Sequence, residues 1–572
     1  MIVVPQEKID LYTARGWWGT RTLYDGFAAN AAAHPDREAV VDAPNRRQFS
    51  DQAPRRLTYG ALAAEVERMA AVLLAHGIGK DDVVVVQLPN GVEQFVVYLA
   101  CARLGVMVSP VPVQYREHEL GHVLGITRAK AAVTLARIGR HAHAAMFAAL
   151  AARHPGGLAV LAWGDALPPA TVDLADALAR AGDAAPVGAY CAAHPVSAND
   201  VFTVCWTSGT EAQPKGVPRS HNEWRIVAPA IIEGAGLQPG CRLLNPFPFV
   251  NMAGLSTNFA AWIELGATVV QHHPFDLEVF LGQLREEAID YTVAAPAILN
   301  QLLQRPALLE GIDFRRLASI GSGAAPLSEW MVRGFGEKYG VQIVNYFGSN
   351  EGASLTGAPR DVPDPAARAQ YFPRAGRPEF DWSVSTARRI RTRLVDLATG
   401  ADIEEPGRVG ELRFAGPTIF SGYFNAPELT ARAFDDQGFY RTGDLFEIAG
   451  PQNQYYRHVG RSKDLVIRGG MNISSEEVEN LVLAHPKVRE AAVVGYPDPI
   501  LGERVCVCVA TVDGADLSLE ELTAFLRAEK RIAAYKLPER IERVDALPRN
   551  PVGKILKRVL RESVARHVEE IR

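Results

Sequence analysis

The sequence predicts an α/β protein built mainly from doubly wound parallel sheets, and two observations favour this class. Between residues 80 and 350, short apolar runs alternate with amphipathic stretches of helical length. This alternation is typical of parallel strands that are covered by helices on both faces. The chain of 572 residues is also longer than one hydrophobic core can serve, so it should divide into several cores.

The apolar runs of this region are the strand candidates. They are VVVVQL at 83–88, AAVTLA at 131–136, VFTVCW at 201–206, ATVVQ at 267–271, YTVAA at 291–295 and VQIVNYF at 341–347. Stretches such as 276–288 and 328–340 lie between them. Their apolar residues recur every three or four positions, as on one face of a helix.

Two different patterns follow along the chain. From about 385 to 459, short segments broken by Gly, Pro and Asp predict a small antiparallel β-barrel. Further on, Ser474 with Glu477 and Ser518 with Glu521 have capping-box spacing, so a helix should follow each serine. We predict a large N-terminal domain at 1–459 with two α/β subdomains and the barrel, a hinge at 460–463, and a smaller α+β domain at 464–572.

The composition narrows the classes of ligand and compartment. A formal charge of −5 offers no long-range attraction for nucleic acid or an anionic membrane, so an anionic ligand must be held by local groups. No uncharged apolar stretch approaches the length of a membrane span, and we expect no membrane insertion. The six cysteines lack metal-ligand spacing, which favours reduced thiols and a cytoplasmic location.

The segment WTSGTEAQPKG at 206–216 is the most informative single motif. Its small residues let a backbone approach an anion, its hydroxyls and N–H groups can donate to phosphate oxygens, and Lys215 adds a positive charge. A polyphosphate cradle is one interpretation of this loop. An ordinary polar turn is an equally good one when the loop is taken alone, and the spacing is not that of a Walker A motif.

This loop resembles that of the adenylate-forming superfamily, which includes acyl-CoA synthetases, peptide-synthetase adenylation domains and luciferases. The family pattern T-S-G-T-T-G-x-P-K-G is met at eight of ten positions, with Glu211 and Ala212 as the departures. Further segments resemble the family's in order: GSGAAPL (321–327), NYFGSNEG (345–352), FYRTGDL (439–445), GRSKDLVIRGG (460–470) and ALPRNPVGKILKR (546–558). The resemblance spans nearly the whole chain.

The resemblance implies an ATP site at matching positions. Phe347 would stack near adenine, Asp444 would accept both ribose hydroxyls with Arg461 beside it, and Asn350 would replace the usual phosphate-side Thr. By itself, an Asp after a Gly is more typical of a turn. The implied ATP and AMP contacts are Thr207, Ser208, Gly209, Thr210, Lys215, Gly323, Ala324, Ala325, Pro326, Tyr346, Phe347, Gly348, Ser349, Asn350, Asp444 and Arg461, with Glu351 and Thr210 holding Mg²⁺.

The resemblance also makes the C-terminal domain a mobile lid. Lys554, which alone looks like one lysine of a basic tail, would be the adenylation lysine, and Glu351 the second catalytic residue. The lid would rotate about the hinge residue Lys463, withdrawing Lys554 and bringing Gly469 and Gly470 to a thiol channel. Attack of a carboxylate on the α-phosphorus brings two anions together, so fixed cations and donors are the residue types that this reaction needs.

The implied acid pocket contains Phe249, Asn251, Met252, Gly254, Gly321 and Phe347. Its apolar character favours a hydrophobic acid of medium-chain, alicyclic or aryl type. The chain is loosely similar to cyclohexanecarboxylate-type CoA ligases and to 2,3-dihydroxybenzoate-AMP ligases. Because no carrier domain is recognisable after the small domain, coenzyme A is the predicted acceptor of the acyl group.

Two alternatives stay open beside this hypothesis. An aryl-acid ligase would pass its acyl group to the phosphopantetheine of a carrier protein. A nucleotide-binding homologue without catalysis is the remoter one, and Glu211, Ala212 and Asn350 are the residues that permit it. The sequence predicts a monomer or a homodimer.

Overall fold

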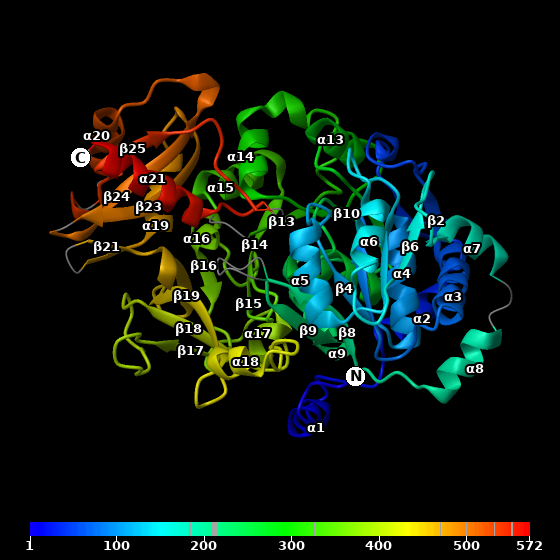
Figure 1. Ribbon diagram of the computed structural model, residues 1–572. Helices are drawn as coiled ribbons and strands as arrows, with labels where there is room; N and C mark the ends of the chain where they lie inside the picture. Colours follow the sequence, from blue (N-terminus) through cyan, green and yellow to red (C-terminus); the bar gives the residue numbers. More distant parts are fainter. Residues whose placement is uncertain are drawn as a thin grey trace.

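The computed structural model describes residues 1–181, 185–207, 214–323, 327–468, 471–498, 500–530, 532, 534–550 and 553–571. In these ranges the strands form four sheets. Two large sheets with their helices make up most of the chain, a smaller antiparallel sheet lies beside them, and the last hundred residues form a separate lobe (Figure 1). The predicted α/β class is confirmed.

The first large sheet is parallel except at one edge, where β8 and β9 are antiparallel. Its strands in spatial order are β7 (Thr171–Asp173), β6 (Ala159–Trp163), β5 (Ala131–Leu135), β3 (Val83–Gln87), β4 (Met107–Pro110), β8 (Val201–Trp206) and β9 (Gly216–Ser220). Every residue of β3, β5 and β8 is buried. Burial on both faces explains why these strands are continuous apolar runs in the sequence.

The second large sheet is also mainly parallel, with antiparallel pairs at its two ends. Its order is β15 (Ser354–Gly357), β14 (Gln342–Gly348), β13 (Ser319–Gly323), β12 (Tyr291–Val293), β10 (Arg242–Asn245), β11 (Thr268–Gln271), β1 (Glu38–Val41) and β2 (Arg56–Thr58). The six strand candidates of the sequence are β3, β5, β8, β11, β12 and β14, each displaced by at most two residues at an end.

Helices cover both large sheets (Figure 1). They are α1 (Gln6–Ala14), α2 (Leu23–Ala33), α3 (Tyr59–Ala75), α4 (Val92–Leu104), α5 (Glu117–Thr127), α6 (His143–Ala151), α7 (Leu174–Arg180), α8 (Ala185–Ala193), α9 (His221–Arg225), α10 (Ala228–Ala235), α11 (Met252–Gly254), the π-helix η2 (Leu255–Ala260), α12 (Ala261–Leu265), α13 (Leu277–Glu286), α14 (Pro296–Gln304), α15 (Glu329–Tyr339) and α16 (Pro365–Gln370). None of the helices in the described ranges combines the length and the apolarity that a membrane span requires.

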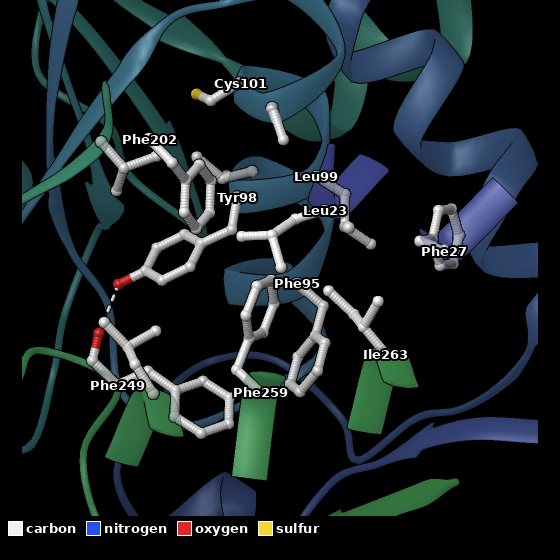
Figure 2. Close-up of a cluster of buried hydrophobic side chains, with 14 of the residues drawn as sticks. Leu23, Phe27, Phe95, Tyr98, Leu99, Cys101, Phe202, Phe249, Phe259 and Ile263 are labelled. Carbon is white, nitrogen blue, oxygen red and sulfur yellow. Dashed lines mark hydrogen bonds between the residues drawn. The ribbon is translucent and has the colours of Figure 1, made fainter. Parts of the chain in front are cut away.

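The largest core lies between the two sheets, around α4. Every residue of α4 except Arg103 is buried, and the core includes strand residues of both sheets, such as Val84 and Val269. An aromatic cluster forms its centre, where Phe95, Phe249 and Phe259 pack together (Figure 2). The Tyr98 hydroxyl donates to the Phe249 carbonyl at 2.7 Å, which fixes the backbone of the segment that follows β10.

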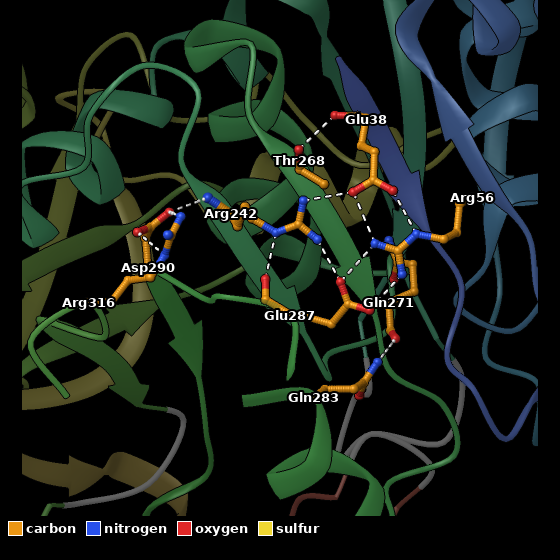
Figure 3. A network of polar contacts seen from close by, with 9 residues as sticks. All are labelled: Glu38, Arg56, Arg242, Thr268, Gln271, Gln283, Glu287, Asp290 and Arg316. Carbon is orange, nitrogen blue, oxygen red and sulfur yellow. Dashed lines mark hydrogen bonds and ion pairs between the residues drawn. The ribbon is translucent and has the colours of Figure 1, made fainter. Parts of the chain in front are cut away.

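An ion-pair network ties the edge of the second sheet together (Figure 3). Arg56 on β2 and Arg242 on β10 each contact both Glu38 on β1 and Glu287 after α13. Arg56 lowers the pKa of the Glu38 carboxyl to about 2 through its hydrogen bond, and Arg242 adds to the effect. The network therefore links β1, β2 and β10 with the end of α13, and it lies toward the edge of the sheet that is formed by β2, away from β14.

The third sheet is antiparallel and has five strands, in the order β16 (Tyr371–Pro373), β20 (Tyr455–Arg461), β19 (Tyr440–Ala449), β18 (Gly410–Ala415) and β17 (Arg391–Val395), with α17 (Ser385–Arg389) and α18 (Pro427–Ala433) beside it. Over the described residues its end strands β16 and β17 do not pair, so the predicted barrel is an open sheet. One reason is the short β16, whose Pro373 has no backbone donor.

The small lobe contains β21 (Val466–Arg468), β22 (Met471–Ile473), β23 (Val488–Asp498), β24 (Gly502–Thr511) and β25 (Arg540–Arg543), with α19 (Ser475–Leu483), α20 (Leu519–Ala528) and α21 (Lys557–Ile571). Ser474 and Ser518 accept hydrogen bonds from Glu477 N and Glu521 N, so both are helix N-caps as predicted. The backbone leaves β20 at Arg461 and enters β21 at Val466. The three-part domain division stays a prediction.

Candidate active site

The predicted phosphate loop is the connection of a β-hairpin. It joins β8 to β9, which pair antiparallel from Trp206 opposite Gly216. Thr207 N donates to the Lys215 carbonyl at 3.0 Å, and Thr207 Oγ1 accepts from Lys215 N at 3.2 Å, so the base of the loop is closed. Ser208, Gly209 and Thr210 lie outside the described residues, as do Ala324, Ala325, Pro326, Gly469 and Gly470.

Lys215 and Glu351, predicted on separate segments, are brought together by Tyr423. The Lys215 ammonium lies 5.5 Å from the centre of the Tyr423 ring, and the Tyr423 hydroxyl donates to Glu351 Oε1 at 3.0 Å. Glu351 is buried, with 7% of its surface exposed. A cation and a carboxylate acceptor therefore share one tyrosine beside the base of the loop.

The turn after β14 carries the next predicted residues. Gly352 has φ +97°, and a Cβ there would collide with the Thr418 carbonyl, so the turn requires glycine. Arg219 on β9 is fully buried and donates to the carbonyls of Asn350 and Thr418 at 3.2 and 3.0 Å. Ser349 Oγ is buried and has no hydrogen-bond partner among the described residues.

Asn350 uses both atoms of its side-chain amide as a bridge. Its Nδ2 donates to the Trp206 carbonyl at 3.1 Å, and its Oδ1 accepts from Met252 N at 2.8 Å. Trp206 ends the strand that leads into the phosphate loop, and Met252 belongs to the predicted acid-pocket segment. The amide that was predicted to face phosphate thus connects these two segments.

Tyr346 and Phe347 alternate along β14 and point to opposite faces of the strand. The Tyr346 hydroxyl contacts the hydroxyl of buried Tyr291 at 3.3 Å, and a Cβ on Gly321 would collide with both tyrosines. Phe347 instead packs near Phe446 and His458, with ring centres 5.1 and 5.7 Å away. Phe347 therefore belongs to the face that meets the antiparallel sheet, whereas Gly321 belongs to the other face.

Asp444 and Arg461 are cross-strand partners on β19 and β20. Arg461 donates from Nε to Asp444 Oδ1 at 2.8 Å and from a terminal nitrogen to Oδ2 at 3.3 Å. Burial opposes ionisation of Asp444, but His458 and Arg461 outweigh it and lower the pKa of the carboxyl. A buried carboxylate is thus held ionised close to Phe347.

The predicted acid-pocket residues lie along one segment. Asn251 caps α11 by accepting from Gly254 N at 3.3 Å, and a Cβ on Gly254 would collide with the Pro248 carbonyl. Met252 is buried, and a Cβ on Gly348 would lie 3.9 Å from its Cγ, so the segment runs beside the end of β14. Phe249 is fully enclosed in the aromatic core of Figure 2.

The two predicted lid lysines lie on either side of the small lobe's sequence. Lys463 is in the short 3₁₀ helix η4 (Ser462–Asp464), directly after β20. Lys554 is exposed and lies in a loop that Asn550 closes, because Asn550 Oδ1 accepts from Lys554 N and Asn550 N donates to the Lys554 carbonyl, both at 2.8 Å. Asn550 thus has a structural role in this loop.

The comparison with known proteins shows the family of the chain. A model of the AMP-binding enzyme family matches residues 27–424, and a model of the AMP-binding enzyme C-terminal domain matches residues 477–554. The chain belongs to the AMP-binding enzyme family. The predicted membership of the adenylate-forming superfamily is confirmed, and the chain is an AMP-forming acid ligase.

Several relatives of this AMP-binding enzyme match along their whole length. The medium-chain fatty-acid–CoA ligase of Escherichia coli (strain K12) is 32% identical over 99% of this chain and 94% of its own. The salicyl-AMP ligase / salicyl-S-ArCP synthetase of Mycobacterium tuberculosis H37Rv is 30% identical over 97% and 93%. The solved structure of ATP-bound MatB from Rhodopseudomonas palustris is 27% identical, with a TM-score of 0.77 over 96% and 99%.

Three residues that contact the predicted site residues of this AMP-binding enzyme carry no predicted role: Arg219, Tyr423 and His458. Each acts through tertiary contacts rather than through a local pattern, and Arg219 lies in a strand, GVPRS, whose Pro and Arg conceal its burial. Tyr423 could have been noticed because it lies within GELRFAGPTIFSGYFNAPELT (410–430), a further segment that resembles the family's. His458 carries no local signal.

Proposed function

We propose that the chain uses ATP to activate a hydrophobic carboxylic acid as acyl-AMP, releasing pyrophosphate, and then transfers the acyl group to coenzyme A. The observation that carries this proposal is the segment 346–351. It places Phe347 beside the Asp444 and Arg461 pair and Glu351 beside Lys215. An aromatic face for adenine, a hydrogen-bond acceptor for ribose and charged groups for a polyphosphate with its metal are the binding groups that ATP requires in one continuous site.

At the nucleoside end, Asp444 is the proposed acceptor of the ribose hydroxyls. A carboxylate can accept two hydroxyl hydrogen bonds at once, and Arg461 keeps it oriented through two donors. Phe347 offers an aromatic face among Phe414, Phe446 and His458, where adenine can stack.

At the phosphate end, the residues present fit a phosphate group with Mg²⁺. Ser349 Oγ is a buried hydroxyl without a described partner, and Glu351 offers a buried carboxylate oxygen. When bound, Mg²⁺ would neutralise charge on the departing pyrophosphate. Lys215 supplies a fixed positive charge at the same end, and Thr207, Ser208, Gly209 and Thr210 are the proposed donors of the loop.

In the proposed first step, a carboxylate oxygen of the acid bonds to the α-phosphorus while the bond to the pyrophosphate oxygen breaks. Lys554 is the proposed cation between the two reacting anions. In the second step the thiol sulfur bonds to the acyl carbon, the thiol loses its proton, and AMP leaves. The proposed rotation about Lys463 exchanges Lys554 for the Gly469–Gly470 turn between the steps.

The substrate proposal rests on the surroundings of Asn251. Met252 is buried, Phe249 closes the base of this segment, and Gly321 and Gly254 leave no room for side chains. An apolar acid with few polar groups suits such walls. Relatives named for a medium-chain fatty acid, a naphthoate and a salicylate support the range of medium-chain and aryl acids.

Coenzyme A is the acceptor that we propose, and a carrier protein is the second candidate. Relatives named as CoA ligases support the first, whereas a relative named salicyl-S-ArCP synthetase supports the second. All six cysteines are unpaired and five are buried, which supports a reducing compartment such as the cytoplasm.

The test uses the purified chain with ATP, Mg²⁺, coenzyme A and a panel of straight-chain, alicyclic and aryl acids. Acid-dependent pyrophosphate exchange measures the first step, and mass spectrometry measures the acyl-CoA. We expect both signals with at least one hydrophobic acid. Exchange without acyl-CoA for every acid would favour a carrier protein, and the absence of exchange with all acids would refute the proposal.

A further inference from the structure

His458 lies at the junction between the nucleoside site and the small lobe. Its side chain is 20% exposed and stands between Phe347, Phe446 and Asp444 of the large domain on one side and Glu476 of α19 on the other. Nδ1 is 2.8 Å from Glu476 Oε2. Nε2 is 3.6 Å from Asp444 Oδ1, an ion-pair separation that exceeds a hydrogen bond.

We propose that His458 is a positioning residue that ties the ribose carboxylate Asp444 to Glu476 of the small lobe, and so holds the lobe in the orientation that favours adenylation. This inference rests on the proposed function. It goes beyond it because it assigns a role to His458, which no predicted motif contains, and to Glu476, which lies within the capping box of Ser474 and Glu477 but has no predicted role.

The neighbourhood of Glu476 extends the tie toward Lys554. Glu479 lies one helical turn further on α19, and its carboxylate is 2.8 Å from the ammonium of Lys557. Lys557 begins α21, three residues after Lys554. A row of charged groups thus runs from Asp444 through His458 and α19 to the segment that carries the adenylation lysine. Glu476 and Glu479 share one face of the helix.

A second contact joins α19 to β20 at the same place. The hydroxyl of Ser474, the N-cap of α19, donates to the carbonyl of Val459, the residue after His458. Rotation of the small lobe about Lys463 would have to break or rearrange both links, since one partner of each precedes the hinge and the other follows it. Of these two links, the ion pair of His458 with Glu476 is the one that a change of charge can remove.

The carboxylates Asp444 of β19 and Glu476 of α19 favour the imidazolium form of His458. The neighbouring cations are Arg461 of β20 and Lys557 of α21, which are paired with Asp444 and with Glu479 of α19. Burial opposes the charged ring, but Glu476 and Asp444 outweigh it and raise the pKa of His458 to about 10. His458 is therefore charged at neutral pH, and the tie weakens as pH rises from about 6.5 toward 10.

The test compares E476Q and H458Q with E477Q in the full chain. Glu477 is the matched control, because it neighbours Glu476 on α19 but pairs at 2.7 Å with Lys536 inside the small lobe. We expect pyrophosphate exchange to fall about fivefold in E476Q and H458Q, as suits a partly exposed ion pair. In E476Q, thioester formation from supplied acyl-adenylate should stay within about twofold of wild type, and E477Q should resemble wild type in both assays.

Two further readouts separate positioning from general damage. The double variant H458Q/E476Q should lose no more exchange than H458Q alone, because H458Q already breaks the pair with Glu476. Between pH 7 and pH 10, exchange should decline more steeply in wild type than in E476Q. Equal loss of both half-reactions in E476Q, or a loss in E477Q as large as in E476Q, would overturn the inference.

The inference can also be judged without turnover. If wild type catalyses neither half-reaction, the proposed function fails. Amide hydrogen exchange then tests the link between His458 and Glu476 independently of activity. E476Q should speed amide exchange in β20 and α19 at residues 455–483, whereas E477Q should not. Unchanged amide hydrogen exchange in E476Q would overturn the proposed link between His458 and Glu476, whether or not the enzyme is active.

Discussion

Asn350 shows how one substitution can change the use of a family position. Its amide bridges the Trp206 carbonyl and the Met252 amide, and therefore couples the start of the phosphate loop to the acid segment. A threonine, the residue usual in the family, has one short hydroxyl and cannot span both partners. Asn350 in place of the family's Thr is thus compatible with an active site.

We predict that N350T lowers acid-dependent pyrophosphate exchange about tenfold, because two buried backbone groups lose their partners. The KM for the acid should rise together with that for ATP, since the bridge joins both segments. Steady-state exchange kinetics at varied acid and ATP measure this, with N350A as the comparison. Higher activity in N350T than in wild type would show that the position acts on phosphate directly.

Tyr423 supplies a second prediction for a single residue. Its hydroxyl fixes Glu351 Oε1 at 3.0 Å, so Y423F leaves a buried carboxylate with one donor fewer. We predict a decrease of about three- to tenfold in exchange, with a higher Mg²⁺ concentration at half-maximal rate. A Mg²⁺ titration of both enzymes measures it. An unchanged Mg²⁺ dependence would argue against a metal role for Glu351.

At the scale of elements, the strands show what the sequence can predict. Buried parallel strands such as β3 and β8 have continuous apolar runs, and they were located to within two residues. By contrast, β9 has a buried arginine, Arg219, which donates to the carbonyl of nearby Glu223 and to the carbonyls of the distant Asn350 and Thr418. The prediction of a closed barrel was wrong. A pattern of short apolar segments shows that strands exist, but it does not show whether the first strand pairs with the last.

The ion-pair network of β1, β2 and β10 gives a prediction for an element. The pKa of Glu38 is lowered from 4.5 to about 2, chiefly by Arg56, so its ionised form stabilises the fold above pH 4.5. This contribution is lost as the pH falls from 4.5 toward 2. E38Q should therefore lower the melting temperature at pH 7 by about 1 to 3 °C, and the difference should shrink below pH 4.5.

Thermal unfolding of wild type and E38Q between pH 3.5 and pH 7 measures this effect. E337Q is a suitable control, because Glu337 is an exposed glutamate on α15, away from the network. A difference between wild type and E38Q that is the same at every pH would show that Glu38 contributes packing rather than charge.

At the scale of the whole molecule, the site is assembled from segments that are far apart in sequence. Motif order identified Lys215, Glu351, Asp444 and Arg461, because a family pattern records local sequence. It could not identify His458, and it left Tyr423 without a role, because both residues join those motifs through side-chain contacts. The sequence therefore predicts the components of the candidate site, and the fold shows which side chains connect them.

The division of labour between the two half-reactions gives the last prediction. Lys554 lies in a loop of the small lobe, whereas Asp444, Glu351 and Lys215 belong to the large one, so adenylation needs both lobes in one relative orientation.

K554A should lower pyrophosphate exchange on the order of a thousandfold, because one cation between two reacting anions is worth several kcal/mol in a closed site. Thioester formation from supplied acyl-adenylate should stay within about threefold of wild type, since that step is proposed to occur after Lys554 has withdrawn. Single-turnover assays of each half-reaction measure the two effects, and K536A, which removes a lysine of the same lobe that pairs with Glu477, serves as the comparison. Equal loss of both half-reactions in K554A would refute the assigned role, because a residue that serves one orientation cannot limit a step that takes place in the other.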